Sequence, residues 1–237
     1  EETGADAVHP GYGFLSENAG FAQAVIDAGL IWIGPKTEAI ATMGSKIEAR
    51  RLAAEARVPI IPGFSDSQEP VDLANAADRI GYPILVKASA GGGGKGIRLA
   101  NDPAEFDTAL NEAVNEAERS FGDGRVIVER FITRPRHVEV QIVGDSHGTT
   151  IDLGTRECSV QRRYQKLLEE APAPNLAEST TTGLRESAVR MAGSIGYDST
   201  GTVEFVVDDE TGDYFFLEMN TRLQVEHPVT EEITGLD

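Results

Sequence analysis

The chain has 237 residues, and its 39 acidic and 21 basic residues give a formal net charge of −18 at pH 7. Such an excess of negative charge disfavours nucleic acids and anionic membranes as partners. A hydrophobic content of 40%, no apolar run near twenty residues and no basic-apolar leader predict a soluble, cytoplasmic protein, and the single cysteine, Cys158, excludes an internal disulfide and fits a reducing compartment.

The first part of the chain predicts the end of an α/β unit. A glycine-punctuated turn over His9–Phe14 is followed by Ser16-Glu17-Asn18, which offers capping residues for a helix over Ala19–Ala28. Leu30–Ile33 then predicts a short buried strand that Gly34-Pro35 ends. A strand, a helix and a strand of this kind are typical of the last units of a parallel sheet.

A helical pattern follows, and after it a compact α+β module. Apolar residues recur at helical spacing from Thr37 to Ala56, and Pro59 ends the pattern. Spacing alone favours a solvated helix lysine for Lys46, which lies on this stretch. The module is expected to contain two helices and about four strands, namely a helix near Val71–Ile80, a glycine-linked hairpin, a helix near Pro103–Ser120 and the strand Val126–Glu129.

The segment from Tyr82 to Leu99 predicts a β-hairpin whose connection is glycine. Five of the six residues from Gly91 to Gly96 are glycine, and the sixth is Lys95. Because glycine disfavours regular elements, we expect a mobile loop whose bare amides and single ammonium suit phosphate. The dinucleotide fingerprint is disfavoured because a β-like segment follows, and a P-loop fails at Ser89 and Gly96. A flexible surface loop remains the alternative.

Beyond Glu129 the pattern changes to longer antiparallel strands, His137–Val143 and Thr149–Leu153. In the first of them, apolar residues alternate with Glu139 and Gln141, which predicts a sheet with one solvent-facing side. A short polar segment and a helix near Thr180–Ile195 come next.

The polar segment concentrates positive charge in an acidic chain. Four cations fall within eleven residues: Arg156, Arg162, Arg163 and Lys166. They predict a second anion site, with a solvated basic patch as the alternative.

Two strands near the C-terminal end carry the acids of greatest interest. Thr202–Val207 is an apolar strand with a single acid, Glu204, and a hairpin over Asp208–Asp213 leads to the strand Tyr214–Asn220. A solvated strand face poorly explains a glutamate inside an otherwise apolar strand.

Side-chain alternation predicts which of these residues meet. Glu218 and Asn220 share one face of their strand, while Leu217 and Met219 occupy the other. If the strands pair, Glu204 approaches the face of Glu218 and Asn220. Two carboxylates and one amide oxygen are hard ligands, so the pattern predicts a Mg²⁺ site. A solvated strand face is the alternative for Glu218 and Asn220.

Arg222, Gln224 and Glu226 continue the same parity, although Thr221–Pro228 is also compatible with a loop. An arginine beside an acid suits the binding and deprotonation of a small oxyanion, as in activation of a carboxylic or carbonic acid. A plain salt bridge is the competing interpretation.

The chain resembles a known family over its whole length, in the motifs HPGYGFLSEN, KASAGGGGKG, RHVEVQI, QRRYQK, EEAPAP, GTVEF and EMNTRLQVEHPVTE. The family is the biotin carboxylase component of biotin-dependent acyl-CoA and pyruvate carboxylases, an ATP-grasp enzyme. The resemblance implies an α+β ATP-grasp fold. Its expected parts are the end of a Rossmann-like domain over 1–35, a helical linker over 36–60, a lid subdomain over 61–130 and an incomplete antiparallel-sheet subdomain over 131–237.

The resemblance also implies a role for each matching residue. Nucleotide-binding positions of the family match Lys46 and Lys87 at the ATP phosphates, Gly93, Gly94 and Lys95 in the lid, Glu129 at the adenine amino group, and His137 and Gln161 near the ribose. Its magnesium (or manganese) ligands match Glu204, Glu218 and Asn220. Its bicarbonate and biotin pocket matches Lys166, Arg222, Gln224, Val225 and Glu226, with Glu226 as the general base.

Two residues depart from the family pattern. Tyr164 stands where the family usually has histidine, and Arg130 replaces a commonly seen lysine beside the adenine. The family also extends before Glu1 and beyond Asp237, where it has an arginine that stabilises the biotin enolate, so the chain is expected to be an internal fragment.

The resemblance implies ATP- and bicarbonate-dependent carboxylation of biotin through carboxyphosphate, in an acyl-CoA carboxylase such as those of fatty acid biosynthesis. Its expected partners are MgATP, bicarbonate, a biotinylated carrier domain and a carboxyltransferase subunit, in a homo-oligomeric parent protein. Two alternatives stay open, a fragment that only binds MgATP and another ATP-grasp ligase that joins a carboxylate to an amine. The final acyl acceptor is also left open.

Overall fold

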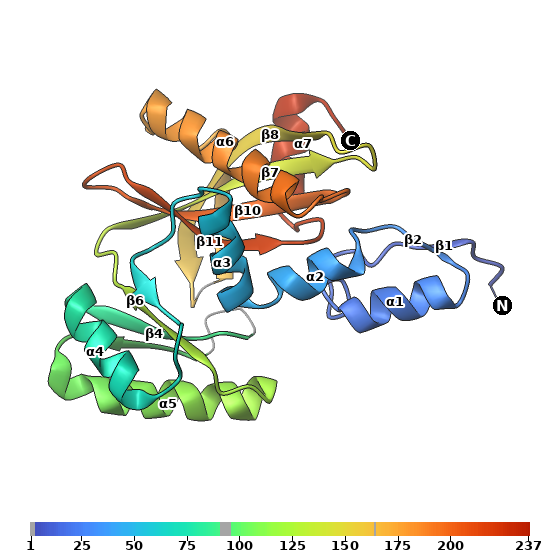
Figure 1. The fold of residues 1–237 in the computed structure, drawn as a ribbon. Helices are drawn as coiled ribbons and strands as arrows, with labels where there is room; N and C mark the ends of the chain where they lie inside the picture. The colour runs from blue at the N-terminus through green and yellow to red at the C-terminus, as the bar shows by residue number, and fades with distance from the viewer. Residues whose placement is uncertain (1–2, 91–95, 164) are drawn as a thin grey trace.

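The structure is a computed structural model that describes residues 3–90, 96–163 and 165–237. Its strands form a two-stranded, a four-stranded and a five-stranded sheet (Figure 1). No helix in the described ranges is long and apolar enough to cross a membrane. We propose to keep the division at residues 35, 60 and 130, because each sheet is built from strands of one of the resulting segments.

The N-terminal unit consists of β1 (Ala7–Val8), α1 (Ala19–Asp27) and β2 (Ile31–Trp32). The two strands pair in parallel, as the strand, helix and strand pattern predicts. The predicted burial of the second strand is wrong, because Ile31 is 64% exposed and Ile33 is 47% exposed. Asn18 caps α1, since its side chain accepts a hydrogen bond from the backbone N–H of Phe21 at 2.8 Å.

The predicted single helix from Thr37 to Ala56 is wrong. The structure has two helices, α2 (Thr37–Met43) and α3 (Lys46–Glu55), separated at Gly44 and Ser45. Ser45 caps α3 by accepting from the backbone N–H of Glu48 at 3.5 Å. The break places Lys46 in the first turn of α3, where its backbone N–H donates to the carbonyl of Ser89 at 3.1 Å.

The second unit is an antiparallel sheet covered by two helices, with the strand order β3-β6-β4-β5. Its elements are β3 (Gly63–Phe64), α4 (Pro70–Ile80), β4 (Ile84–Ala88), β5 (Ile97–Ala100), α5 (Pro103–Phe121) and β6 (Val126–Arg130). Among the described residues this gives the two helices and four strands that the sequence predicts. The predicted mobile glycine loop, residues 91–95, lies outside the described residues.

Side chains along β4 and β6 alternate between the buried face and the opposite face of the four-stranded sheet. Val86 and Val128 are fully buried in the cluster that packs against α4 and α5. Lys87 and Glu129, one position further along each strand, lie on the opposite face of the sheet. The four-stranded sheet therefore directs an ammonium and a carboxylate away from its own core.

The third unit is a five-stranded antiparallel sheet with the strand order β11-β10-β7-β8-β9. Its elements are β7 (Pro135–Gly144), β8 (Thr150–Arg162), β9 (Gln165–Glu170), α6 (Glu178–Ser194), β10 (Thr200–Asp208), β11 (Tyr214–Asn220) and α7 (His227–Thr234). The predicted strand Thr149–Leu153 is too short, because β8 runs on through the supposed polar segment and pairs with β9. Between β11 and α7 the chain forms a short loop.

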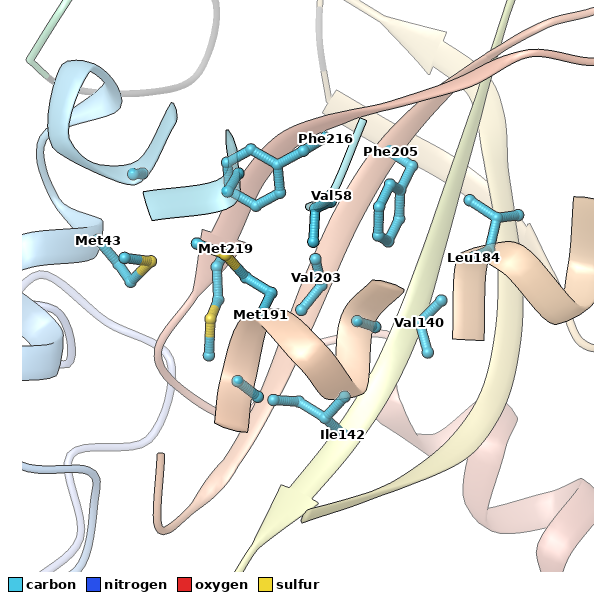
Figure 2. Packing of buried hydrophobic residues seen from close by; sticks show 14 of the residues in the cluster. Met43, Val58, Val140, Ile142, Leu184, Met191, Val203, Phe205, Phe216 and Met219 are labelled. Carbon is cyan, nitrogen blue, oxygen red and sulfur yellow. The ribbon is translucent and has the colours of Figure 1, made fainter. Parts of the chain in front are cut away.

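One face of this sheet makes the main hydrophobic core (Figure 2). Val140 and Phe205 on the strands and Leu184 on α6 are fully buried there. Met43 of α2 and Ala53 of α3 belong to the same cluster, so the two helices pack on this face together with α6. The core thus fixes the start of α3, which carries Lys46, relative to the sheet.

The other face of the sheet is not the solvent-facing side that the sequence predicts. Glu139 and Gln141 are both 0% exposed. Arg156 of β8 covers them, and α7 lies above it, with the Thr230 hydroxyl 2.8 Å from the Arg156 guanidinium. Alternation correctly placed Glu139 and Gln141 on the face opposite the core, but it did not reveal that a helix and an arginine cover that face.

Gly144, at the end of β7, tests how closely the backbone packs at the edge of this core. A Cβ at Gly144 would lie 2.0 Å from the carbonyl oxygen of Tyr197, whereas a Cβ at Gly193 in α6 would meet nothing within 4 Å. We expect Gly144→Ala to destabilise the protein by about 1–3 kcal/mol, because backbone must move. Gly193→Ala, the matched control, is expected to stabilise it by about 0.4–1 kcal/mol. Urea unfolding measures both changes, and equal midpoints for the two variants would contradict the close packing of Gly144 against Tyr197.

Candidate active site

A cavity of about 630 Å³ lies between the four-stranded and five-stranded sheets. Every described residue to which the family resemblance assigns a role lines this cavity. They are Lys46, Lys87, Glu129, His137, Gln161, Lys166, Glu204, Glu218, Asn220, Arg222, Gln224, Val225 and Glu226. The three remaining candidates, Gly93, Gly94 and Lys95, lie outside the described residues.

Glu129 lies between two cations at the end of the cavity formed by the four-stranded sheet. Its carboxylate accepts from Lys87 Nζ at 2.6 Å and from Arg50 Nη1 at 2.9 Å. Arg50 of α3 lines the cavity too, although it is not among the residues predicted from the sequence. The available signal was its spacing, because Arg50 follows Lys46 by four residues and so shares its helix face. Lys46 itself is only 21% exposed at its side chain, which excludes the solvated-lysine interpretation.

Glu204 and Glu218 face each other across paired strands at the opposite wall. They are register partners in β10 and β11, so the two strands pair and Glu204 approaches the face of Glu218, as expected for paired strands. The next pair is Phe205 with Phe216, so Leu217 is an extra residue in a β-bulge. The bulge brings Leu217 to the cavity beside Glu218, which corrects its predicted place on the opposite face, whereas Met219 is 3% exposed in the core as expected.

The two carboxylates have opposite electrostatic surroundings. Burial would raise the pKa of Glu204, but its contacts with His137 and Lys166 outweigh burial and hold that pKa well below its usual range. Burial and the charge of Glu204 raise the pKa of Glu218, and Lys46, with its Nζ 3.9 Å from the Glu218 carboxylate, opposes the rise only in part. Glu218 therefore faces a neighbouring negative charge without full compensation.

A divalent cation fits this pair, because it would neutralise the repulsion between two hard carboxylate ligands. Asn220 adjoins them: its Nδ2 donates to Glu204 at 2.9 Å, and its Oδ1 accepts from Arg222 at 3.0 Å. The amide oxygen thus faces Arg222 here, and as a metal ligand it would have to turn toward the carboxylates.

Lys166 of β9 joins the carboxylates of three different segments. Its Nζ lies 2.5 Å from Glu139, 2.8 Å from Glu204 and 2.6 Å from Glu226. Burial would lower the pKa of Lys166, but the surrounding acids raise it well above its ordinary value. The ammonium is therefore a fixed positive charge that holds the candidate general base beside a candidate metal ligand.

The predicted anion site of four cations is wrong, because β8 and β9 separate its members. Lys166 lies on the cavity, whereas Arg162 and Arg163 are exposed. Arg156 is fully buried, and its guanidinium donates to Glu139 at 2.5 Å and to Gln141 at 2.9 Å. The number of cations in a stretch of sequence does not show which of them is buried. Arg156 forms a buried ion pair, whereas Arg162, six residues further along β8, is exposed.

Arg222 and Glu226 lie in the loop after β11 and have different partners. Arg222 Nε donates to Glu17 at 2.8 Å, so its salt bridge is to the N-terminal unit and not to Glu226. The Gln224 side-chain amide is oriented with its nitrogen toward Glu226, and this nitrogen donates to Glu226 Oε1 at 2.7 Å. Val225 is 62% exposed at the cavity wall. The arginine and the acid thus line one cavity without neutralising each other.

His137 and Gln161 meet at the side of the cavity. Gln161 Nε2 lies 2.8 Å from His137 Nδ1, and His137 Nε2 lies 2.9 Å from the Glu204 carboxylate. Burial disfavours the charged imidazole, yet Glu204 raises the pKa of His137 above its ordinary value. Arg130, the second departure from the family pattern, stacks over the ring of Phe215 at 5.5 Å, and Tyr164 lies outside the described residues.

Two family profiles together match almost the whole chain. The profile "Carbamoyl-phosphate synthase L chain, ATP binding domain" matches residues 45–237, and "Biotin carboxylase, N-terminal domain" matches residues 1–40. The chain is 54% identical over 239 residues to the propionyl-CoA carboxylase alpha chain of Ruegeria pomeroyi, covering 99% of this chain and 34% of that protein. It is 51% identical to the mitochondrial methylcrotonoyl-CoA carboxylase subunit alpha of Arabidopsis thaliana, covering 99% and 32%.

The chain thus spans about a third of the length of these relatives. Among solved structures, a biotin carboxylase-beta-gamma-ATP complex from Campylobacter jejuni superimposes with a TM-score of 0.96 at 46% identity, covering 100% of this chain and 53% of that one. The biotin carboxylase domain dimer of Hydrogenobacter thermophilus 2-oxoglutarate carboxylase, in complex with MgADP, ADP and bicarbonate, gives 0.94 at 46% identity, covering 100% and 52%. The chain has an α+β ATP-grasp fold and belongs to the biotin carboxylase family of biotin-dependent carboxylases.

Proposed function

We propose that the protein carries out ATP- and bicarbonate-dependent carboxylation of biotin, the biotin carboxylase half-reaction of an acyl-CoA carboxylase. The observation that carries the proposal is the position of Lys166. Its ammonium contacts both Glu226, the proposed base for bicarbonate, and Glu204, a proposed metal ligand beside the phosphates. A single ammonium thereby holds the proposed base for bicarbonate close to the proposed metal site, where the phosphates of ATP would lie.

The relatives support the substrate class. Propionyl-CoA and methylcrotonoyl-CoA carboxylases are among them, and solved relatives were determined with ATP, MgADP or bicarbonate. These names favour an acyl-CoA carboxylase and give no specific support to the expected role in fatty acid biosynthesis. Because the chain spans about a third of these relatives, the activity is proposed for the protein that contains it.

In the proposed first step, Glu226 removes the proton of bicarbonate while Arg222 binds its oxygens. The bicarbonate oxygen attacks the γ-phosphorus of ATP, which gives carboxyphosphate and ADP. Carboxyphosphate then breaks down to CO₂ and phosphate, the phosphate takes the N1 proton of biotin, and N1 bonds to CO₂. Lys166 keeps Glu226 oriented toward the cavity by its 2.6 Å contact, and Gln224 and Val225 complete the bicarbonate pocket.

The proposed contacts to MgATP come from several parts of the chain. Lys46 and Lys87 are proposed to hold the ATP phosphates, together with Gly93, Gly94 and Lys95. Glu129 is proposed to face the adenine, and His137 and Gln161 the ribose. Glu204, Glu218 and Asn220 would hold Mg²⁺ or Mn²⁺, which supplies positive charge to the phosphate oxygens when bound.

The proposed partners follow from the half-reaction. Biotin is proposed to arrive on a biotinylated carrier domain, and a carboxyltransferase subunit to take the carboxyl group onward. We also propose a homo-oligomeric parent protein, since one solved relative is a biotin carboxylase domain dimer. A cytoplasmic location is proposed, although some relatives are mitochondrial by name.

The alternative that this chain alone only binds MgATP stays open, because it spans about a third of the relatives. The other alternative, a different ATP-grasp ligase, is disfavoured by the match of residues 1–40 to the biotin carboxylase N-terminal domain.

The function is tested by ADP release from the full-length protein with free biotin. We expect release to depend on bicarbonate, because bicarbonate supplies the nucleophile that attacks ATP. Calorimetric titration of the present chain with MgATP, next to an assay of biotin carboxylation, separates a binding module from a complete enzyme. ADP release that is independent of bicarbonate would contradict the proposed reaction.

Replacing the proposed base tests its assignment. Glu226→Gln keeps the shape of the side chain but removes the proton acceptor, so we expect kcat for bicarbonate-dependent ADP release to fall by about 10²–10⁴-fold. The KM for MgATP should change little, since Glu226 is not proposed to bind the nucleotide. Glu232→Gln, an exposed residue on α7, is the matched control. A kcat within a few-fold of the wild type would remove Glu226 from the base role.

A further inference from the structure

Arg50 belongs to a three-residue charge cluster at the wall of the cavity. The Glu129 carboxylate is shared between Lys87 at 2.6 Å and Arg50 at 2.9 Å, and each contact uses a different oxygen. The three side chains are 10–11% exposed, so water screens them weakly. In such surroundings an unpaired carboxylate is strongly disfavoured.

The two cations differ in origin and in freedom to move. Lys87 lies on β4, in the same sheet as Glu129, and has a flexible stem that ends in a single ammonium. Arg50 reaches Glu129 from α3, outside that sheet, with a planar fork suited to holding a carboxylate in one orientation. Lys87 is therefore the cation that can change partner, and Arg50 the one that can remain.

The backbone around the cluster is shaped to admit the arginine. Gly63 of β3 pairs with Glu129, and a Cβ at Gly63 would lie 2.9 Å from Glu129 Cγ and 3.1 Å from Arg50 Nη2. That Cβ would also lie 2.7 Å from the carbonyl oxygen of Val128, so a larger residue at position 63 would disturb the strand pairing and the contact between Arg50 and Glu129 together. The contact between Arg50 and Glu129 is thus accommodated by the sheet itself and is not a chance meeting of surface side chains.

We propose that Arg50 is a positioning residue for nucleotide binding: it neutralises Glu129 so that Lys87 can leave this carboxylate and contact an oxyanion of the nucleotide. The inference rests on the proposed function. With Arg50, the cluster has one more positive charge than negative charges. Without it, Lys87 and Glu129 form a neutral pair, and a phosphate could gain Lys87 only by leaving Glu129 buried and unpaired.

The test measures the Kd of MgATP by calorimetry on the full-length protein. Arg50→Met is expected to weaken binding about tenfold or more, equivalent to roughly 1.4 kcal/mol. Arg50→Lys keeps the charge and is expected to stay within about threefold of the wild type. Arg51→Met is the matched control, because Arg51 is exposed on the same helix and pairs with Glu48 and Glu55.

A double variant distinguishes this role from general damage to the fold. Because Glu129 is itself proposed to face the adenine, the double variant Arg50→Met with Glu129→Gln is compared with Glu129→Gln alone. Without the carboxylate there is no negative charge for Arg50 to neutralise, so the two variants are expected to bind MgATP within about threefold of each other. The double variant carries no unpaired carboxylate and remains informative if the Arg50→Met variant fails to fold. A folded double variant that binds at least tenfold more weakly than the Glu129→Gln variant would overturn the proposal, as would equal affinities of the Arg50→Met and Arg51→Met variants. A wild-type protein that does not bind MgATP would instead refute the proposed function.

Discussion

The candidate site depends on a buried ion pair between Arg156 and Glu139, which lies next to Lys166. Arg156 and Glu139 lie on neighbouring strands and are both fully buried. Arg156 Nε donates to the Glu139 carboxylate at 2.5 Å. Removing either partner would leave an uncompensated charge, which typically costs about 3–5 kcal/mol. Glu139 also accepts from Lys166, so the buried pair fixes the ammonium from behind. The position of Lys166 in the cavity therefore depends on an ion pair whose two residues do not line the cavity.

The same arginine connects the sheet to the helix that follows the proposed base. Its guanidinium donates to Thr230 on α7 at 2.8 Å, and Glu226 directly precedes that helix. Glu226 is thus held at two points, by its own contact with Lys166 and by the anchoring of α7 on Arg156. Because both attachments lead back to β8 and β9, a change in the pairing of these strands would move Glu226 and Lys166 together.

Sequence reasoning recovered those features that depend on local periodicity. A period of two placed Glu218 and Asn220 on one face and indicated that Glu204 approaches it if the strands pair, and the pairing of β10 with β11 agrees. It could not show what covers a strand face, so Glu139 was expected to face solvent. Nor could it place the bulge at Leu217, since an extra residue in one strand leaves no mark in the pattern of polarity. The helix break before Lys46 does not show in the apolar spacing, which continues across Gly44 and Ser45. Gly44 caps the end of α2 and Ser45 caps the start of α3, so the residue types at these two positions were the available signal.

The cavity that is proposed to bind ATP has no surplus of positively charged side chains among its described lining residues. Among its described lining residues, the cations are Lys46, Arg50, Lys87, Lys166 and Arg222, and the carboxylates are Glu129, Glu169, Glu204, Glu218 and Glu226. Five formal positive charges thus meet five negative ones, in a chain whose net charge is −18. Paired charges keep a buried polar wall stable in the absence of ligand. Affinity for a phosphate then depends on which cations can exchange partners at low cost, and a carboxylate with two cations, such as Glu129, is where such an exchange is cheapest.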